Sequence, residues 1–294
     1  MHKNIPIIAF CALGIIWGSN FIYMKWASEV ISPLQIVFIR ILFGFIPVFM
    51  YAYLKKELKI ADLKYSVHFF VMSLLGTTIY YYFFVKASSL LLSGVAGALS
   101  GSIPLFTFIL ALIFIKEERA NLFSTMGVTI GFIGVVLIAN PFALDLFSTN
   151  IKGVLSIVIG SFVIGSSFVY AKKFIVPLRL HFAALATYQL GFALFVLLFI
   201  IDFNGIENIY SDTHIFLGSV FGLGLLGTGV AYIIYYFLIE NLGAIAASSV
   251  TYLPPLVALF IGYIFVGENI TLVDFMATIL IFVGVFLINK SRSK

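Results

Sequence analysis

Charged residues are scarce in this sequence of 294 residues. Asp, Glu, Lys and Arg make up only 10% of it, against roughly 25% in soluble domains. Hydrophobic residues make up 62%, and the mean hydropathy is +1.16. A soluble fold of this length could not hide so much apolar surface. The composition therefore excludes an ordinary soluble protein and indicates a chain that lies in a lipid bilayer.

Cysteine and the usual patterns of reactive side chains are also missing. The single Cys11 excludes an internal disulfide. The four His residues and the 12 acidic residues show no metal-ligand spacing, and no Walker motif indicates use of ATP. All the acidic residues are assigned to loops or to the ends of apolar stretches. We therefore expect no metal, no cofactor and no enzymatic activity.

What the sequence does contain is a series of long uncharged stretches between short charged loops. A helix needs about 20 apolar residues to cross a hydrocarbon core of roughly 30 Å. The apolar runs are continuous rather than alternating, which favours helices. Lys3 precedes the first run, but that run is too long for a signal peptide and has no small-residue cleavage site. The sequence predicts ten transmembrane helices, at 5–24, 33–54, 66–86, 93–115, 121–140, 152–172, 181–201, 214–238, 244–266 and 271–289.

Basic residues indicate the orientation of these helices. With the N-terminus in the cytoplasm, 13 of the 17 Lys and Arg residues fall in inside segments. Cytoplasmic loops carry such an excess, so we expect both termini in the cytoplasm and a multi-pass protein of the inner membrane. Because the basic residues are scattered through short loops that face lipid, we expect no binding to nucleic acid.

An internal repeat runs through the chain at an offset of 151 residues. Leu74 to Thr77 (Leu-Leu-Gly-Thr) recurs as Leu225 to Thr228, and Pro104 matches Pro255. Each copy contains five predicted helices, an odd number, so the second copy enters the membrane from the opposite side. Such inverted pairs are usual in transporters that alternate access about a central site. We predict an all-α membrane protein with two repeats, 1–145 and 146–294, around a central cavity.

The motifs resemble those of the EamA-type transporters in the drug/metabolite transporter superfamily. The stretch Trp17 to Phe21, followed by Ser32-Pro33 and Arg40, looks like the opening of such a repeat. Pro104, Glu117, Gly127 and Gly134 look like its close, which the second copy repeats with Pro255, Glu268 and Gly284. The opening of the second copy differs: Ile164 to Phe168 stands where Trp17 to Phe21 stood, and Gln189 stands where Arg40 stood.

This resemblance implies ten helices, cytoplasmic termini and transport of small molecules. We expect a secondary transporter that exports amino acids, including aromatic ones, or similar metabolites. The alternative is a carrier of drugs, nucleosides or amines on the same scaffold. A membrane enzyme, receptor or scaffold is a third class, but it would not need mirrored helix breaks. Ten spans with an internal repeat allow a functional monomer.

Arg40 is the only charge well inside a predicted span, about 10 Å beyond Pro33 at 1.5 Å per residue. A charge at that depth costs several kcal/mol unless it is paired or faces water. It either recognises an anionic group such as a substrate carboxylate, or has a structural role by bonding backbone carbonyls or reaching the interface. Gln189 at the matching position shows that this slot also accepts a neutral side chain.

Further polar and aromatic side chains lie within the spans and are candidates to contact cargo. Cavity lining and helix packing are both open for them, although a Tyr hydroxyl inside a membrane needs a partner. Tyrosines from both halves would suit a flat or amphipathic cargo. The full set of candidate substrate-binding residues is Trp17, Asn20, Arg40, Tyr80, Tyr81, Tyr82, Ser100, Ser166, Tyr170, Gln189, Tyr232, Tyr235 and Tyr252.

Prolines and glutamates mark matched positions in the fourth and ninth spans. Pro104 and the pair Pro254-Pro255 should interrupt the backbone hydrogen bonds there, either to shape a cavity or to kink the bundle. Glu117 and Glu268 close the same spans on opposite faces of the membrane. We interpret them mainly as helix-end anchors that pair with loop groups or accept amide hydrogen bonds, with gating as the alternative. Glycines at helical spacing indicate close helix packing.

Overall fold

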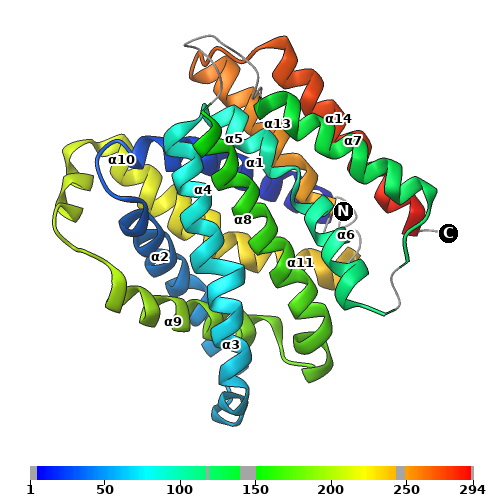
Figure 1. The fold of residues 1–294 in the computed structure, drawn as a ribbon. Coiled ribbons are helices and arrows are strands. Elements are labelled where there is room, and N and C mark those ends of the chain that lie inside the picture. Colours follow the sequence, from blue (N-terminus) through cyan, green and yellow to red (C-terminus); the bar gives the residue numbers. More distant parts are fainter. Residues whose placement is uncertain (1–4, 117–118, 140–149, 243–248, 293–294) are drawn as a thin grey trace.

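A computed structural model describes residues 5–116, 119–139, 150–242 and 249–292. Every regular element in these ranges is helical (Figure 1). The elements, in chain order, are α1 (Ile5–Ala27), α2 (Pro33–Leu54), η1 (Ile60–Tyr65), α3 (Ser66–Ser73), η2 (Leu74–Thr78), α4 (Ile79–Leu90), α5 (Ser93–Ser100), α6 (Ile103–Phe114), α7 (Leu122–Ala139), α8 (Ile151–Tyr170), η3 (Ala171–Ile175), η4 (Val176–Leu178), α9 (Phe182–Ile200), η5 (Ile206–Ser211), α10 (Thr213–Leu217), η6 (Gly218–Val230), α11 (Ala231–Leu242), η7 (Ser249–Tyr252), α13 (Leu253–Phe260), η8 (Ile261–Phe265) and α14 (Leu272–Arg292).

The ten predicted spans each have a helical counterpart. Seven helical stretches are long and apolar enough to cross a membrane, and three shorter apolar ones, at Leu122–Ile138, Val250–Phe265 and Leu272–Ile288, complete the set. The second span shows how the sequence fixes a boundary. Ser32 and Gln35 form a capping box at the start of α2, and Pro33 occupies its first position. These features satisfy or remove amides that have no partner inside the helix.

The repeated Leu-Leu-Gly-Thr motif adopts π-helix in both copies, which the sequence analysis did not foresee. It forms η2 between α3 and α4, and the end of η6 between α10 and α11. In η6 the hydroxyl of Thr228 donates to the carbonyl of Leu223, five residues earlier, at 3.1 Å. Short π-helical segments are rare in proteins, and many of those that occur lie at functional sites. The third and eighth spans are therefore continuous but locally widened at matched positions.

The fourth and ninth spans contain the expected irregularities beside their prolines. α5 ends at Ser100, a turn covers Gly101 and Ser102, and α6 begins at Ile103 with Pro104 in its first turn. In the ninth span, the 3-10 segment η7 precedes α13, and Pro254 and Pro255 lie in the first turn of that helix. A proline is tolerated there because the first amides of a helix have no partner within it.

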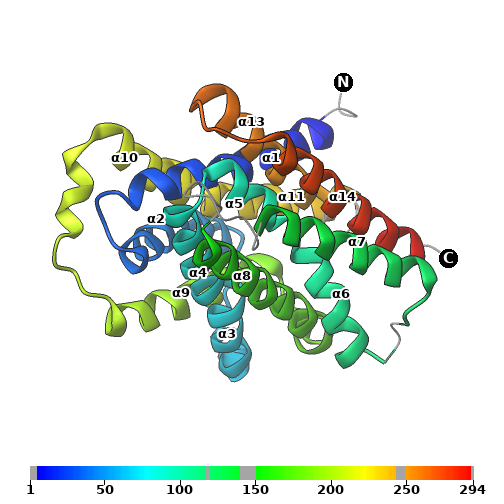
Figure 2. The ribbon, with the colours of Figure 1, turned by 45° about the horizontal axis from the view of Figure 1, so that its top comes forward.

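The two halves of the chain interlock rather than sit side by side. α2 packs against η6, α4 against α8, α5 against α13, and α7 against α14. Figures 1 and 2 both show α7 and α14 as a long pair at one side of the bundle. The Lys290 ammonium near the end of α14 lies over the Phe123 ring at the start of α7, so these matched helices run antiparallel. This is the arrangement that an inverted repeat requires.

Glycines allow the close approach of α7 and α14. A Cβ atom added to Gly284 would meet the carbonyl oxygen of Gly127 and lie 2.8 Å from the Cα of Gly131. A methyl group at Gly284 therefore has no room unless the two helices separate. Small residues at helix crossings allow such close backbone approach in membranes.

Replacement of Gly284 by Ala should weaken this helix pair. We expect Gly284→Ala to destabilise the protein by about 1–3 kcal/mol, as overpacking commonly does, and to lower its thermal unfolding temperature in detergent. Gly191→Ala is the matched control, because the nearest atom to its added Cβ, in Phe45, lies 3.7 Å away. Ala is the better helix former in both places. A Gly284→Ala protein as stable as Gly191→Ala would contradict the packing argument.

Candidate functional site

Arg40 lies at the centre of a polar cluster between the two halves. It is on α2 and only 5% exposed. Its Nε donates to the hydroxyl of Thr228 on η6 at 3.1 Å. Its guanidinium carbon lies 3.8 Å from the centre of the Tyr81 ring on α4, a stacked cation–π arrangement. Its Nη1 lies 3.8 Å from the Met24 sulfur.

Asn20 on α1 supplies the remaining hydrogen bond. With its amide oriented to satisfy both neighbours, its oxygen accepts from Arg40 Nη2 at 3.1 Å and its nitrogen donates to the Ile16 carbonyl at 3.1 Å. Asn20 lies against Gly227 of the Leu-Leu-Gly-Thr motif, where a larger residue would collide with the amide. Helices from both halves therefore hold one guanidinium group in place.

The positive charge of Arg40 has only neutral partners. A hydroxyl, an amide oxygen, a thioether and an aromatic face surround it, and no acidic side chain of the described ranges contacts it. An Arg side chain carries five N–H donors, of which these contacts use three. A buried charge without a counter-charge is costly. Among the described residues, the guanidinium group of Arg40 is therefore held by neutral groups only.

Tyrosines from the two halves meet beside this charge. Tyr80 and Tyr81 have ring centres 4.3 Å apart. Tyr80 also interacts electrostatically with Tyr232 and Arg40. Tyr81 and Tyr232 are 151 residues apart and therefore occupy the same position in the two repeats. Tyr81 is buried, whereas Tyr80 and Tyr232 are half-buried and pack against the main apolar core.

Gln189 forms the mirror image of the Arg40 contact. Its Nε2 donates to the Thr77 hydroxyl at 2.6 Å and to the Gly76 carbonyl at 3.2 Å. Thr77 and Thr228 are the matched threonines of the repeated motif. The motif therefore receives, in each half, the polar side chain of a helix from the other half. The sequence indicates that Arg40 and Gln189 occupy matching positions, but their contacts with the motif threonines were not predicted.

The contacts given for the other candidate residues are outside the Arg40 cluster. Some of these residues form their hydrogen bonds within their own helix. Ser100 donates to Gly97 and Ser166 donates to Phe162, each within its own helix. Tyr252 packs against the apolar cluster of Leu105, Phe108, Val285 and Ile288.

Aromatic contacts account for four more of the candidates. The Trp17 ring packs on Tyr235 with centres 5.7 Å apart. The Tyr82 ring lies edge-on to that of Phe83. Tyr170, at the end of α8, shares a 2.7 Å hydrogen bond with His68 Nδ1. Of these contacts, none joins the Arg40 group.

Glu268 joins three separate parts of the fold at one end of the bundle. Its carboxylate is buried and accepts hydrogen bonds from the amides of Ser93 at 2.7 Å and Gly94 at 3.0 Å, at the start of α5. The Lys25 ammonium lies 3.8 Å away and donates to the Leu91 carbonyl. A carboxylate at a helix N-terminus is favourable for the helix dipole. Its matched residue, Glu117, lies outside the described residues.

Comparison with known proteins supplies a family for this architecture. The profile of the EamA-like transporter family matches residues 4–140 and 151–290. The chain is 23% identical over 284 residues to the uncharacterized transporter YoaV of Bacillus subtilis, covering 96% of this chain and 95% of that protein. It is 26% identical over 288 residues to the uncharacterized inner membrane transporter YedA of Escherichia coli, with 97% and 90% covered. A crystal structure with 16% identity has the same fold at a TM-score of 0.63, covering 96% of this chain and 95% of its own.

The two matched threonines offer a direct test of the unequal charge at the site. Thr228→Val removes the acceptor of a buried charged donor, so we expect a loss of about 1.5–3 kcal/mol in stability. Thr77→Val removes the acceptor of the neutral Gln189, which keeps its bond to Gly76, and should cost about 0.5–1.5 kcal/mol. Thermal unfolding of both variants in detergent measures the difference. Equal losses would show that Thr228 does not support the charge on Arg40.

Proposed function

The chain belongs to the EamA-like transporter family and is a multi-pass membrane transporter, and from this premise we propose that it exports amino acids or similar carboxylate-bearing metabolites. The transport is secondary and proceeds by alternating access. The cargo binds between the two halves, with its carboxylate at Arg40 and its side chain against the tyrosines.

The buried, unpaired guanidinium carries this proposal. Arg40 is 5% exposed and has neutral partners only. Its existing contacts fix its orientation, while two of its five N–H donors have no partner in the described residues. Arg presents a planar fork that suits a carboxylate. An anionic cargo would supply the counter-charge that the described residues do not provide.

The tyrosines support an apolar or aromatic side chain on that cargo. Tyr80 lies near both Arg40 and Tyr232, and Tyr80 and Tyr232 are half-buried. Aromatic rings stack favourably with flat apolar groups in offset or edge-on arrangements. The combination of one cation and several rings fits an amino acid such as an aromatic or large apolar one. The position that matches Arg40 in the other repeat holds the neutral Gln189. The two repeats together would therefore provide one anion-binding group rather than two.

The mirrored contacts support alternating access. Arg40–Thr228 and Gln189–Thr77 each link the two halves, and each ends on a π-helical motif. Exchange of the conformations of two inverted repeats would expose the site to each side in turn. We place the repeats at 1–145 and 146–294, and the termini in the cytoplasm because of the distribution of Lys and Arg. The bacterial inner membrane is the proposed location, in keeping with the name of the relative YedA.

An uncharged nucleoside is the remaining alternative cargo. Ring stacking on tyrosine needs no charge on the ligand, so the aromatic part of the site would serve a nucleobase as well. A cationic drug or amine fits less well, because the positive charge of Arg40 would repel it.

Counterflow into proteoliposomes preloaded with unlabelled amino acids tests the proposed function. We expect preload-dependent uptake of labelled aromatic or large apolar amino acids. Arg40→Gln should weaken the apparent affinity for these by at least about tenfold, because a buried charge pair is worth several kcal/mol. Lys86→Gln is the control, since it removes a positive charge from the end of α4, near Tyr82 but outside the Arg40 cluster.

Amides of the same amino acids sharpen the assay, since they lack the carboxylate. The wild-type protein should bind them weakly, and Arg40→Gln should change that binding little. If Arg40→Gln carries the carboxylate cargo with unchanged affinity, the role proposed for Arg40 is wrong. If the folded wild-type protein carries nucleosides and no amino acid, the alternative cargo is correct.

A further inference from the structure

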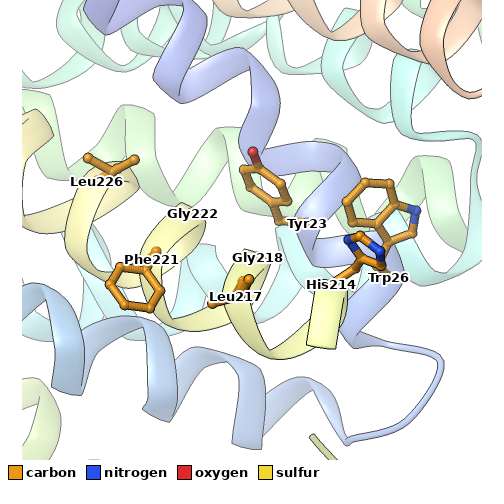
Figure 3. Close-up of a pocket in the computed structure, with 8 residues that line it drawn as sticks. All are labelled: Tyr23, Trp26, His214, Leu217, Gly218, Phe221, Gly222 and Leu226. Carbon is orange, nitrogen blue, oxygen red and sulfur yellow. The ribbon is translucent and has the colours of Figure 1, made fainter. Parts of the chain in front are cut away.

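A groove runs along the contact between α1 and the eighth span, separate from the Arg40 cluster. We call it the α1–η6 groove. Its volume is about 340 Å³. Figure 3 shows Tyr23 and Trp26 of α1 facing a wall made by α10 and η6. The residues that line it are Tyr23, Trp26, His214, Leu217, Gly218, Phe221, Gly222 and Leu226.

Glycines form the floor of the groove. The Tyr23 ring lies directly on the backbone at Gly218 and Gly222, where added Cβ atoms would be 2.9 Å and 2.6 Å from ring carbons. Trp26 packs beside Tyr23 with ring centres 5.8 Å apart. The two glycines therefore seat the tyrosine ring, and the hollow lies beside that ring. The hollow is therefore built by specific residues at a fixed place.

The outer wall of the groove is apolar and exposed on the surface of the helix bundle. Leu217, Phe221 and Leu226 are 44%, 47% and 44% exposed. They follow one another at intervals of four and five residues, which keeps them on one face of a helix that is partly π-helical. Apolar side chains exposed within a transmembrane span contact lipid tails. The groove is thus open to the bilayer rather than to the interior of the protein.

The length of the groove matches one leaflet. His214 lies near the start of the eighth span and Leu226 lies 12 positions further along, which is roughly 15–18 Å at up to 1.5 Å per residue. Half of a hydrocarbon core is about 15 Å thick. Trp26 and His214 lie at the outer end, where amphipathic rings typically sit at the level of the head groups. The groove therefore runs from the interface toward the middle of the membrane.

We propose that one acyl chain of a membrane phospholipid occupies the α1–η6 groove. The walls carry no charged Asp, Glu, Lys or Arg side chain, so nothing along them would recognise a charged cargo. The exposed leucine and phenylalanine side chains match a flexible hydrocarbon chain, which would gain van der Waals contacts along the groove. Continuity with the bilayer supplies the chain. The head group would lie beside Trp26 and His214.

The position of the groove connects this lipid to the transport machinery. Leu226, at its inner end, directly precedes Gly227 and Thr228, which hold Asn20 and Arg40. A chain in the groove would contact the same π-helical segment from the membrane side. It would hold α1 against the eighth span in this conformation, and it would leave when those helices separate. The inference concerns lipid binding and does not rest on the identity of the cargo.

Fluorescence of Trp26 tests this proposal in the full-length protein. The chain has two tryptophans, so Trp17→Phe leaves Trp26 as the only fluorophore. In this background, we measure Trp26 fluorescence in bilayers with an increasing fraction of brominated phosphatidylcholine. A lipid bound in the groove should quench Trp26 at a lower brominated fraction than random contact with the surrounding lipids would. Leu217→Phe with Leu226→Phe should narrow the groove and weaken the apparent affinity for brominated lipid about fivefold, because the acyl chain loses van der Waals contacts.

The control replaces an exposed residue outside the groove. Leu198 on α9 is 54% exposed, and Leu198→Phe should leave the quenching of Trp26 unchanged. Identical quenching curves for the narrowed protein and the control would overturn the proposal. Loss of quenching in the narrowed protein alone supports a bound acyl chain.

Discussion

The burial of Arg40 in a membrane bundle is the constraint on which the centre of this structure depends. A guanidinium group at that depth must be surrounded by hydrogen-bond acceptors, because lipid offers none. Asn20, Thr228 and the face of Tyr81 meet this requirement from three different helices. Their arrangement requires α1, α2, α4 and η6 to converge at one point. The glycine beside Thr228 makes that convergence possible, because a side chain at Gly227 would displace Asn20.

The inverted repeat uses the same contact twice with different chemistry. In one half a charged side chain reaches the motif threonine, and in the other the neutral Gln189 does so. A symmetric scaffold needs both contacts, because each fastens a helix of one half to the other. The charge, however, is present only once. Structural symmetry and chemical asymmetry therefore coexist, and a site with one anion-binding group can lie near an axis that relates the two halves.

Close backbone approach recurs wherever the halves meet. Gly127 and Gly284 bring α7 and α14 together, Gly97 meets Ala258 where α5 crosses α13, and Gly218 and Gly222 accommodate Tyr23. Without a hydrophobic driving force between helices in lipid, packing and polar contacts hold the bundle together. Glu268 shows the polar form of this principle, since it ties the start of α5 to the loop after η8 and to Lys25. Helices fastened by small residues and a few polar links can separate and re-form with little loss of apolar burial.

Composition and pattern alone determined much of this protein. Ten apolar stretches, matched prolines and a repeated motif were sufficient to predict a ten-helix membrane bundle, because a spanning helix is set by its length and hydrophobicity. Arg40 was identifiable as the one charge well inside a predicted span. Its partners were not, because Thr228 lies 188 residues away and helix crossings are not written in local periodicity. Tertiary packing likewise decided three other features: the π-helical form of the motif, the hydrogen bonds of Glu268 to the start of α5, and the α1–η6 groove. Packing does so because it brings together side chains that are far apart in the sequence.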